Sequence, residues 1–224
     1  MDYVFHFDVI RNYFPDFLKA CWLSIRLGLI CIIITSIIGV VLGALLTTNN
    51  KVVRGVIRVY VESFRLTPFL VQMLFVYFGI PLFLGVTLDS IKAGVVTLGL
   101  NGGAYAAETF RAGFQSVPRT QMESALSIGL TKTQAYTRVI IPQGIRSVLP
   151  YFISSCTMIL KDTSFFSIIG VMEATGFIRY AASLTYRNFE LFTILGLFYI
   201  IFTLVIGQIG KILENRVGRH EQNN

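Results

Sequence analysis

Long apolar stretches run through this sequence and restrict what it can fold into. They cover approximately residues 23–46, 60–84, 91–110, 148–172 and 189–213. An α-helix needs roughly 20 apolar residues to cross the hydrocarbon core of a bilayer, and each stretch is long enough for one crossing. We therefore predict an all-α membrane protein with five transmembrane helices.

The composition supports a membrane protein. Hydrophobic residues make up 54% of the 224 residues and charged residues only 14%, whereas soluble domains contain about 25% charged residues. We expect residues 1–224 to form a single transmembrane domain, because no stretch is left over for a soluble one. The net charge of +7 could indicate nucleic-acid binding. However, the basic residues lie between apolar runs rather than on one face, so we expect no nucleic-acid partner.

Basic residues are distributed unevenly between the two predicted sides of the membrane. One side holds Lys51, Arg54, Arg58, Arg111, Arg119, Lys132, Arg138, Arg146, Lys211, Arg216 and Arg219. The other side has fewer, namely Arg11, Lys19, Lys92, Arg179 and Arg187. Cytoplasmic loops are enriched in Lys and Arg, so we predict a cytoplasmic C-terminus and an N-terminus outside. We expect the first helix to be an uncleaved anchor, because the N-terminus lacks the basic start and the cleavage site of a signal peptide.

The polar connection at about residues 111–146 is predicted to be cytoplasmic. Residues 121–128 show a short helical pattern that Gly129 interrupts. A second helical pattern follows, for which Thr131 is a suitable N-cap, and Pro142 is predicted to end or kink it. Together these features predict a compact knob of two short helices.

This connection contains the run ESALSIGLTKTQAYTRVIIP, which resembles the EAA loop of ATP-binding-cassette (ABC) importer permeases. The matching positions are Glu123, Ser124, Ala125, Gly129, Val139, Ile141 and Pro142. Residues 61–81 (VESFRLTPFLVQMLFVYFGIP), 100–121 and 160–170 are similar to the polar amino-acid subfamily of these permeases. Leu66 departs from the Gly that is usual in that subfamily.

The resemblance implies a type I ABC importer permease fold in a prokaryotic inner membrane. Its implied partners are ABC ATPase subunits, a second permease subunit of the same or a similar kind, an extracellular solute-binding protein and a polar amino acid. The implied residues that couple transport to the ATPase are Glu123, Ala125, Gly129, Ile141 and Pro142. The sequence has no Gly-x-x-x-x-Gly-Lys-Ser/Thr loop, so we expect no cofactor and no enzymatic activity in this chain, with ATP and Mg bound to the ATPase subunits.

Charged residues inside predicted spans are candidates for the translocation path, because charges in a membrane are costly and face protein or water. Glu62 and Arg65 are three residues apart and share a helical face. Pro68 cannot donate a hydrogen bond to the carbonyl group of Phe64, and interrupted helices of this kind line transporter sites. We expect Glu62, Arg65 and Thr67 to bind substrate, with a Glu62–Arg65 ion pair at a packing kink as the alternative.

Another group of polar residues, called the polar step below, interrupts the fourth apolar stretch. It consists of Lys161, Asp162, Thr163 and Ser164. Asp162 could hold a cationic amino group, and Thr163 and Ser164 could offer hydroxyl groups. The resemblance implies that this segment lines the path near a dimer axis. A Lys161–Asp162 ion pair, or an ion pair between subunits, is the alternative.

Other polar and small residues are expected to be structural. Glu108 and Arg111 are predicted to form a structural or gating pair. Gly99, Gly102 and Gly103 give the third stretch a side of small residues that allows close helix packing. Cys21, Cys31 and Cys156 lack the spacing of a metal or redox site and are predicted to pack in the apolar interior.

Two other functional classes remain open at this point. An ion-coupled secondary carrier or channel would also bury acidic residues, but the sequence shows no inverted hydropathy repeat. A membrane-embedded enzyme would need a catalytic group. His6 and His220 lie near the two ends of the chain, and no HExxH motif occurs.

Overall fold

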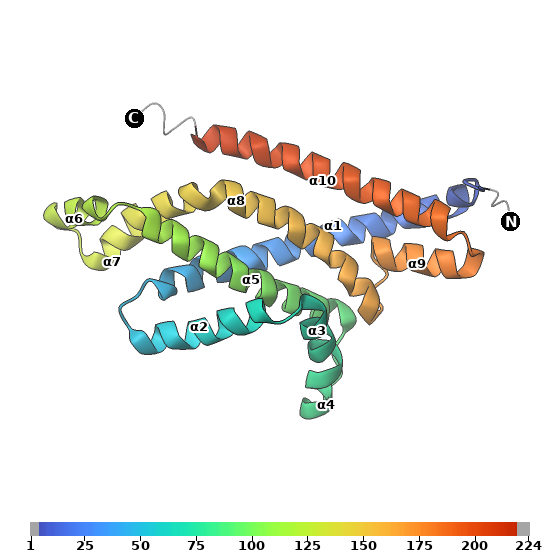
Figure 1. Cartoon of the computed structure of the whole chain (residues 1–224), viewed down its shortest axis with the longest axis horizontal. Coiled ribbons are helices and arrows are strands. Elements are labelled where there is room, and N and C mark those ends of the chain that lie inside the picture. Colours follow the sequence, from blue (N-terminus) through green and yellow to red (C-terminus); the bar gives the residue numbers. More distant parts are fainter. Residues whose placement is uncertain (1–4, 219–224) are drawn as a thin grey trace. The chain divides into compact units, whose positions relative to one another are not determined.

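The fold was analysed in a computed structural model of the chain that describes residues 5–218. Arg219 and His220, which figure in the sequence analysis, lie outside these residues. The elements in chain order (Figure 1) are α1 (Val9–Leu46), α2 (Lys51–Leu66), α3 (Phe69–Leu74), η1 (Phe75–Gly79), α4 (Ile80–Leu84), α5 (Ser90–Ser116), α6 (Arg119–Ser127), α7 (Lys132–Ala135), η2 (Tyr136–Ile140), α8 (Ile141–Asp162), η3 (Thr163–Ile169), α9 (Ala174–Thr185) and α10 (Asn188–Gly218). The described residues form helices and their connections, as predicted.

The helices include several that are long and apolar enough to cross a membrane. These are Val9–Leu46, Lys132–Ile169 and Asn188–Gln208, and the bent pair Lys51–Leu66 and Phe69–Leu84 would add a fourth, broken span. The helix at the third predicted stretch, α5, is not among these candidates. The number of five crossings and the orientation of the termini therefore stay predictions.

Several helices extend beyond the predicted stretches. α2 begins at Lys51 rather than near residue 60, α5 continues to Ser116 rather than ending near residue 110, and α8 begins at Ile141 rather than near residue 148. α1 begins at Val9, well before residue 23, and continues through Pro15. Its early start is explained by packing, because Phe17 is buried in a core with residues of α9 and α10. Pro142 was predicted to end or kink the second helix of the knob. It does not end it, because the helical residues continue from Lys132 through Pro142 to Asp162.

The π-helical turn η2 explains why Pro142 does not end the helix. In an α-helix, Pro142 would leave the carbonyl group of Arg138 without its donor. The backbone of η2 instead forms longer-range bonds, and the N–H of Ile141 donates to the carbonyl group of Tyr136. The proline thus falls just after a turn that has already left the α-helical bonding pattern.

The chain divides into two compact units. The first comprises the described residues up to Cys31, Leu70–Leu98 and Thr157–Gln208, and the second comprises Ile32–Phe69, Gly99–Cys156 and the described residues from Ile209 onward. The prediction that residues 1–224 form a single transmembrane domain stays a prediction.

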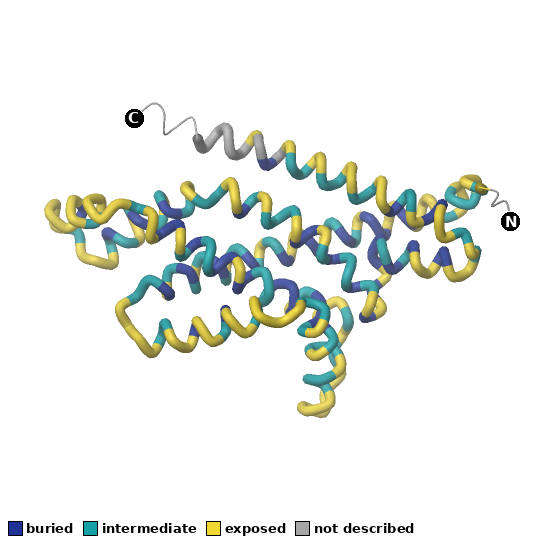
Figure 2. Tube along the Cα trace, viewed as in Figure 1, coloured by how far each residue is buried: buried dark blue, intermediate teal, exposed yellow. Residues whose placement is uncertain are grey.

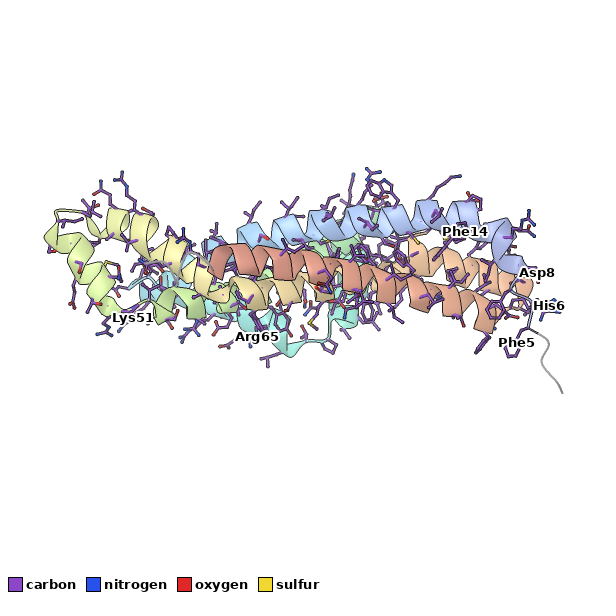
Figure 3. All side chains as sticks on the ribbon, turned by 90° about the horizontal axis from the view of Figure 1, so that it is seen from above. Phe5, His6, Asp8, Phe14, Lys51 and Arg65 are labelled. Carbon is purple, nitrogen blue, oxygen red and sulfur yellow. The ribbon has the colours of Figure 1, made fainter. Side chains whose placement is uncertain are left out.

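The first unit has an apolar core where α9 lies beside α1 and α10 (Figure 1). The buried residues of this core are Phe17, Cys21, Ala174, Ile178, Ala181, Ala182, Leu191 and Leu195. Phe5, His6 and Asp8 gather before and at the start of α1 (Figure 3), where the backbone N–H of His6 donates to the buried carboxylate of Glu190 at 2.9 Å. The N-terminal segment is thereby attached to the start of α10.

In the second unit, α5 packs closely against α1 through glycines. A Cβ atom built at Gly99, Gly102 or Gly103 would lie 2.5–2.6 Å from the side chains of Ile34, Thr35 and Ile38, respectively. Such distances are shorter than real Cβ contacts, so a larger residue at any of these positions would force a neighbouring side chain to move. The predicted packing role of the small-residue side is confirmed.

α2 covers another part of the second unit. Its buried residues Ile57 and Val61 pack with Leu46 and Ala107, and the opposite side of α2 is exposed along its length (Figure 2). The hydroxyl group of Tyr60 donates to the carbonyl group of Leu100 at 2.6 Å. These contacts fix the end of α2 beside the middle of α5, where the candidate site lies.

Candidate functional site

The site begins at the break after α2. Thr67 is extended (φ −109°, ψ 142°) and ends the helix before Pro68. Its hydroxyl group donates to the carbonyl group of Ser63 at 2.7 Å. The hydroxyl group predicted to contact substrate is thus engaged with the backbone in this conformation.

Two side chains of α5 complete the bonding at this break. The carbonyl group of Phe64, which Pro68 cannot serve, accepts a hydrogen bond from Nδ2 of Asn101 at 3.4 Å. The next carbonyl group, that of Arg65, accepts a hydrogen bond from the hydroxyl group of Tyr105 at 3.5 Å. Polar backbone at a helix break needs such partners, because an unpaired group away from water is costly. The predicted break at Pro68 is therefore confirmed, with its donors now named.

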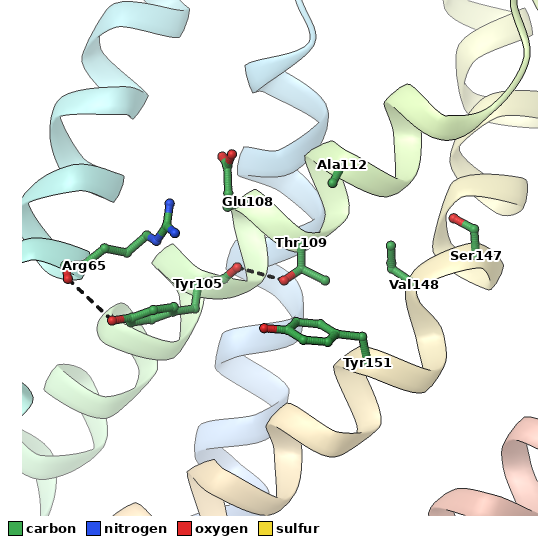
Figure 4. Close-up of a pocket in the computed structure, with 8 residues that line it drawn as sticks. All are labelled: Arg65, Tyr105, Glu108, Thr109, Ala112, Ser147, Val148 and Tyr151. Carbon is green, nitrogen blue, oxygen red and sulfur yellow. Dashed lines mark hydrogen bonds between the residues drawn. The ribbon is translucent and has the colours of Figure 1, made fainter.

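A pocket of about 370 Å³ lies beside this break in the second unit (Figure 4). It is lined by Arg65, Tyr105, Glu108, Thr109, Ala112, Ser147, Val148 and Tyr151. The guanidinium carbon of Arg65 lies 5.6 Å from the centroid of the Tyr105 ring, a cation–π distance. Tyr105 thus holds both the backbone and the charged group of Arg65.

The two charged residues of the pocket, Glu108 and Arg65, differ in whether an ion-pair partner is bound to them. Glu108 receives two hydrogen bonds from Arg111, one of them from Nε at 3.0 Å, so the predicted pair exists. Glu62 and Arg65 are both exposed, and the described residues contain no ion pair between them. The alternative of a Glu62–Arg65 ion pair is therefore wrong for this conformation, and the Arg65 guanidinium faces the pocket without a carboxylate bound to it.

The polar step at residues 161–164 belongs to the first unit, where it spans the end of α8 and the start of η3. Lys161 is exposed and Asp162 half-buried, and no ion pair between them occurs in residues 5–218. Thr163 is fully buried, and its hydroxyl group donates to the carbonyl group of Leu160 at 2.8 Å. Ser164 is half-buried. The role of these four residues in substrate binding stays a prediction.

The knob of short helices has the expected form. Gly129 has a left-handed backbone (φ +86°), and Thr131 caps α7 through a reciprocal capping box with Gln134. Ala125 is buried, whereas Glu123 is exposed and available to a partner. The knob is thus a pair of helices joined at a glycine turn, as the sequence predicts.

Ile141 and Pro142, the last two predicted coupling residues, lie at the start of α8 rather than in the knob itself. Ile141 is half-buried and packs on the core around Phe110 and Phe114, whereas Pro142 is exposed. Directly before them, the ring of Tyr136 meets that of Phe114 edge-on at 6.2 Å. These contacts connect the knob to α5 as well as to α8.

Several site residues were not identified from the sequence. Tyr105, Thr109, Ser147 and Tyr151 line the pocket, but each is an ordinary polar or aromatic residue in its own helix. A spacing signal was present: Tyr105, Glu108 and Thr109 recur at helical intervals on α5, as Ser147 and Tyr151 do on α8. Without knowing which helix faces Arg65, that signal did not point to a pocket.

Residues 30–219 match the family described as "Binding-protein-dependent transport system inner membrane component". The glutamine transport system permease protein GlnP of Escherichia coli K12 is 34% identical over 182 residues, covering 81% of this chain and 83% of the relative. The nopaline transport system permease protein NocM of Agrobacterium fabrum is 31% identical over 216 residues, covering 92% and 90%.

A solved structure agrees with these sequence matches. It is described as the crystal structure of an amino acid ABC transporter with histidines, and it is 32% identical in sequence with a TM-score of 0.87. The match covers 96% of this chain and all of that one. The type I importer permease fold is confirmed, and the findings do not support the ion-coupled carrier or channel. The chain belongs to the family of binding-protein-dependent transport system inner membrane components, and it is a multi-pass permease subunit of an ABC importer.

Proposed function

We propose that this chain translocates a polar amino acid and that it is driven by ATP hydrolysis on separate ABC ATPase subunits. In the proposed complex it pairs with a second permease subunit of the same or a similar kind and receives substrate from an extracellular solute-binding protein. The ATPase subunits bind ATP and Mg, and this chain has no ATPase site of its own. The amino-acid substrates in the names of its relatives support this substrate class.

The pocket beside Arg65 is the observation that carries the proposal. Its volume of about 370 Å³ falls in the range of roughly 300–1,000 Å³ that small-molecule sites occupy. Arg65 presents a guanidinium group, which suits a carboxylate in two-pronged geometry. Glu108 presents a carboxylate that is shared with Arg111 and could attract an ammonium group. A zwitterionic amino acid would complement both charges.

The hydroxyl groups around the pocket suit a polar ligand. Ser147 and Tyr151 come from α8, and Tyr105 and Thr109 come from α5 (Figure 4). Thr109 donates to the carbonyl group of Tyr105 at 3.1 Å, so its hydroxyl oxygen can still accept a bond. Because the two helices are connected through the knob, movement of the knob would change the distance between the two sides of the pocket.

The proposed energy input is movement of the knob on an ATPase subunit. Glu123 is exposed on α6 and could pair with a basic group of that subunit. Glu123→Lys and Gly129→Asp, which reverse a charge and add one on the exposed surface of the knob, are expected to leave ATP hydrolysis in the reconstituted transporter but to abolish accumulation of substrate. Normal uptake by both variants would contradict a coupling role for the knob.

Substitution of Arg65 tests the pocket. In proteoliposomes containing the complete transporter, Arg65→Ala should lower the uptake rate roughly tenfold or more, because a hydrogen bond to a charged group contributes about 1.5–3 kcal/mol. Arg65→Lys keeps the charge but loses the two-pronged geometry, so its rate should be intermediate. Basal ATP hydrolysis and membrane insertion should be unchanged for both variants.

Arg58→Ala serves as the matched control, since it removes the same charge from an exposed position of the same helix that does not line the pocket. If Arg58→Ala and Arg65→Ala lower uptake equally, the effect belongs to net charge and the pocket assignment fails.

Asp162→Asn is a separate test of the polar step at residues 161–164: it should weaken transport without reducing membrane insertion.

A further inference from the structure

A fully buried acidic group lies in the first unit, apart from the pocket and the knob. Glu173, the residue before α9, has no exposed surface. Its Oε1 accepts a hydrogen bond from the N–H of Gly176 at 2.9 Å, which caps α9. Its Oε2 lies 2.9 Å from the hydroxyl group of Ser24 on α1. The carboxyl group therefore joins two helices that are far apart in the sequence.

Ser24 can satisfy a carboxyl group in either protonation state. Its oxygen accepts a hydrogen bond from the N–H of Ala174 at 3.0 Å and lies 3.3 Å from the carbonyl oxygen of Ala20. If Glu173 carries a proton, it donates to Ser24 and the Ser24 hydroxyl group donates to Ala20, so every oxygen has a partner. If Glu173 is ionised, Ser24 must donate to it, and the bond to Ala20 is lost.

No cation offsets a negative charge at this position. The ion pairs formed by residues 5–218 do not include Glu173. The titratable groups that interact with it are the thiol group of Cys21 on α1 and the phenol group of Tyr199 on α10, which is hydrogen-bonded to Glu173. Neither of them supplies a positive charge. Burying an ionised carboxylate without a cation is far more costly than burying a hydrogen-bonded neutral acid. Burial also raises the pKa of the Glu173 carboxyl group, because it disfavours the charged form, and this effect outweighs the hydrogen bonds from Ser24, Thr175 and Gly176, which lower the pKa.

Glu190, in the same unit, provides the contrast. It is equally buried, but Nη1 of Arg187 lies 4.0 Å from its Oε1, and the N–H of His6 donates to the same oxygen. A carboxylate at Glu190 therefore has a cation beside it. Two buried acids in one unit thus have opposite surroundings.

We infer that Glu173 carries a proton in the folded protein and that it forms, with Ser24, an uncharged hydrogen-bonded link between α1 and the start of α9. Glutamine has the shape of this neutral acid: its amide group can donate to Ser24 while its oxygen accepts from Gly176. The link should therefore tolerate glutamine. This inference does not depend on the proposed substrate or on the role of the knob.

Thermal unfolding of the complete detergent-purified transporter tests the link. At neutral pH, Glu173→Gln should have a Tm at least as high as that of the unchanged protein and the same uptake rate, whereas Glu173→Ala should lower both. Glu190→Gln is the matched control: it removes a charge that Arg187 pairs with, so it should lower the Tm. If Glu173→Gln is destabilised as much as Glu173→Ala, the proton assignment is overturned.

Infrared spectroscopy provides a direct reading of the proton. At neutral pH the unchanged protein should show a C=O stretch of a buried protonated carboxylic acid that Glu173→Gln lacks. Ser24→Ala should shift this band, because the acid loses its acceptor. The inference fails if no such band disappears in Glu173→Gln, or if Ser24→Ala leaves the band in place.

Discussion

The hydroxyl group of Tyr136, the first residue of η2, forms a hydrogen bond with Oγ1 of Thr47, the residue that follows α1. Oγ1 of Thr47 also donates to the carbonyl group of Ala44 at 2.7 Å, so its own proton is engaged within α1 and Tyr136 is the donor. The base of the knob is thereby attached to the end of α1. Movement of the knob would act on α1 directly as well as through α8.

Removing this bond should weaken coupling. Tyr136→Phe and Thr47→Val each delete one partner, and a bond of this kind contributes about 1 kcal/mol. We expect each variant to lower the amount of substrate transported per ATP hydrolysed, and the double variant to be no worse than either single one. The measurement is parallel uptake and ATP hydrolysis in proteoliposomes.

Thr137→Val is the control for that pair. It replaces a threonine hydroxyl group by a methyl group, as Thr47→Val does, and it lies next to Tyr136. However, the hydroxyl group of Thr137 donates only to the carbonyl groups of Thr133 and Gln134 in the preceding helical turn. Its transport ratio should equal that of the unchanged protein. Additive losses in the Tyr136 and Thr47 variants would show that the two side chains act separately.

The glycine turn of the knob gives a second prediction. Gly129 has φ +86°, and a Cβ atom there would meet nothing within 4 Å, so a substitution is opposed by backbone conformation rather than by space. A left-handed conformation costs an ordinary residue roughly 1–2 kcal/mol, and Asn tolerates it better than most. Gly129→Val should therefore uncouple uptake from hydrolysis, whereas Gly129→Asn should transport normally. Equal behaviour of the two variants would contradict this account.

Close packing of α5 on α1 gives a third prediction. A Cβ atom at Gly102 would lie 2.5 Å from Oγ1 of Thr35 but 3.4 Å from its Cβ. Gly102→Ala alone should destabilise the protein by about 1–3 kcal/mol, as overpacking does. Adding Thr35→Ala removes the clashing atoms and should restore much of the Tm.

Thr35→Val distinguishes shape from polarity at this contact. The hydroxyl oxygen of Thr35 is buried and has no hydrogen-bond partner among the described residues, so the valine variant should be at least as stable as the unchanged protein. Because valine keeps the shape of threonine, it should not rescue Gly102→Ala. Rescue by valine would mean that the hydroxyl group, not its volume, opposes the alanine.

The pH dependence of stability gives a fourth prediction. The pKa of Glu173 is raised by burial in the folded protein, whereas in the unfolded chain it should be about 4.3. Between these two values the unfolded chain binds fewer protons, so stability falls as pH rises, by up to about 1.4 kcal/mol per pH unit. Glu173→Gln has no proton to lose. Its Tm should therefore rise relative to that of the unchanged protein as pH increases above about 4.3, and a constant difference would contradict the prediction.

The parts of this structure that the sequence predicted are those with local signals. Gly129 and Thr131 define the knob through a left-handed turn and a capping box, both of which involve residues only a few positions apart. Pro68 likewise predicted the break after α2 through a missing N–H group. The resemblance to importer permeases predicted the fold class because its motif residues have fixed spacing.

The parts that could not be predicted depend on contacts between distant residues. Asn101 and Tyr105 donate hydrogen bonds to carbonyl groups 37 and 40 positions away in the sequence, and no local pattern marks them as donors. Pro142 carried a local signal for a helix end, but the preceding π-helical turn accommodated it. Glu173 was overlooked because an isolated acid beside an apolar stretch resembles an ordinary loop residue until its burial is known.

The π-helical turn η2 also sets which side of α8 is presented to the pocket. Such a turn contains one residue more than the α-helical path, and each residue of an α-helix rotates the chain by about 100°. Deleting one residue between Tyr136 and Ile140 would straighten the helix and turn Ser147 and Tyr151 away from Arg65 by that angle. A chain shortened by a single residue would thus keep its hydrophobic segments and its knob, yet Ser147 and Tyr151 would no longer face Arg65 across the pocket.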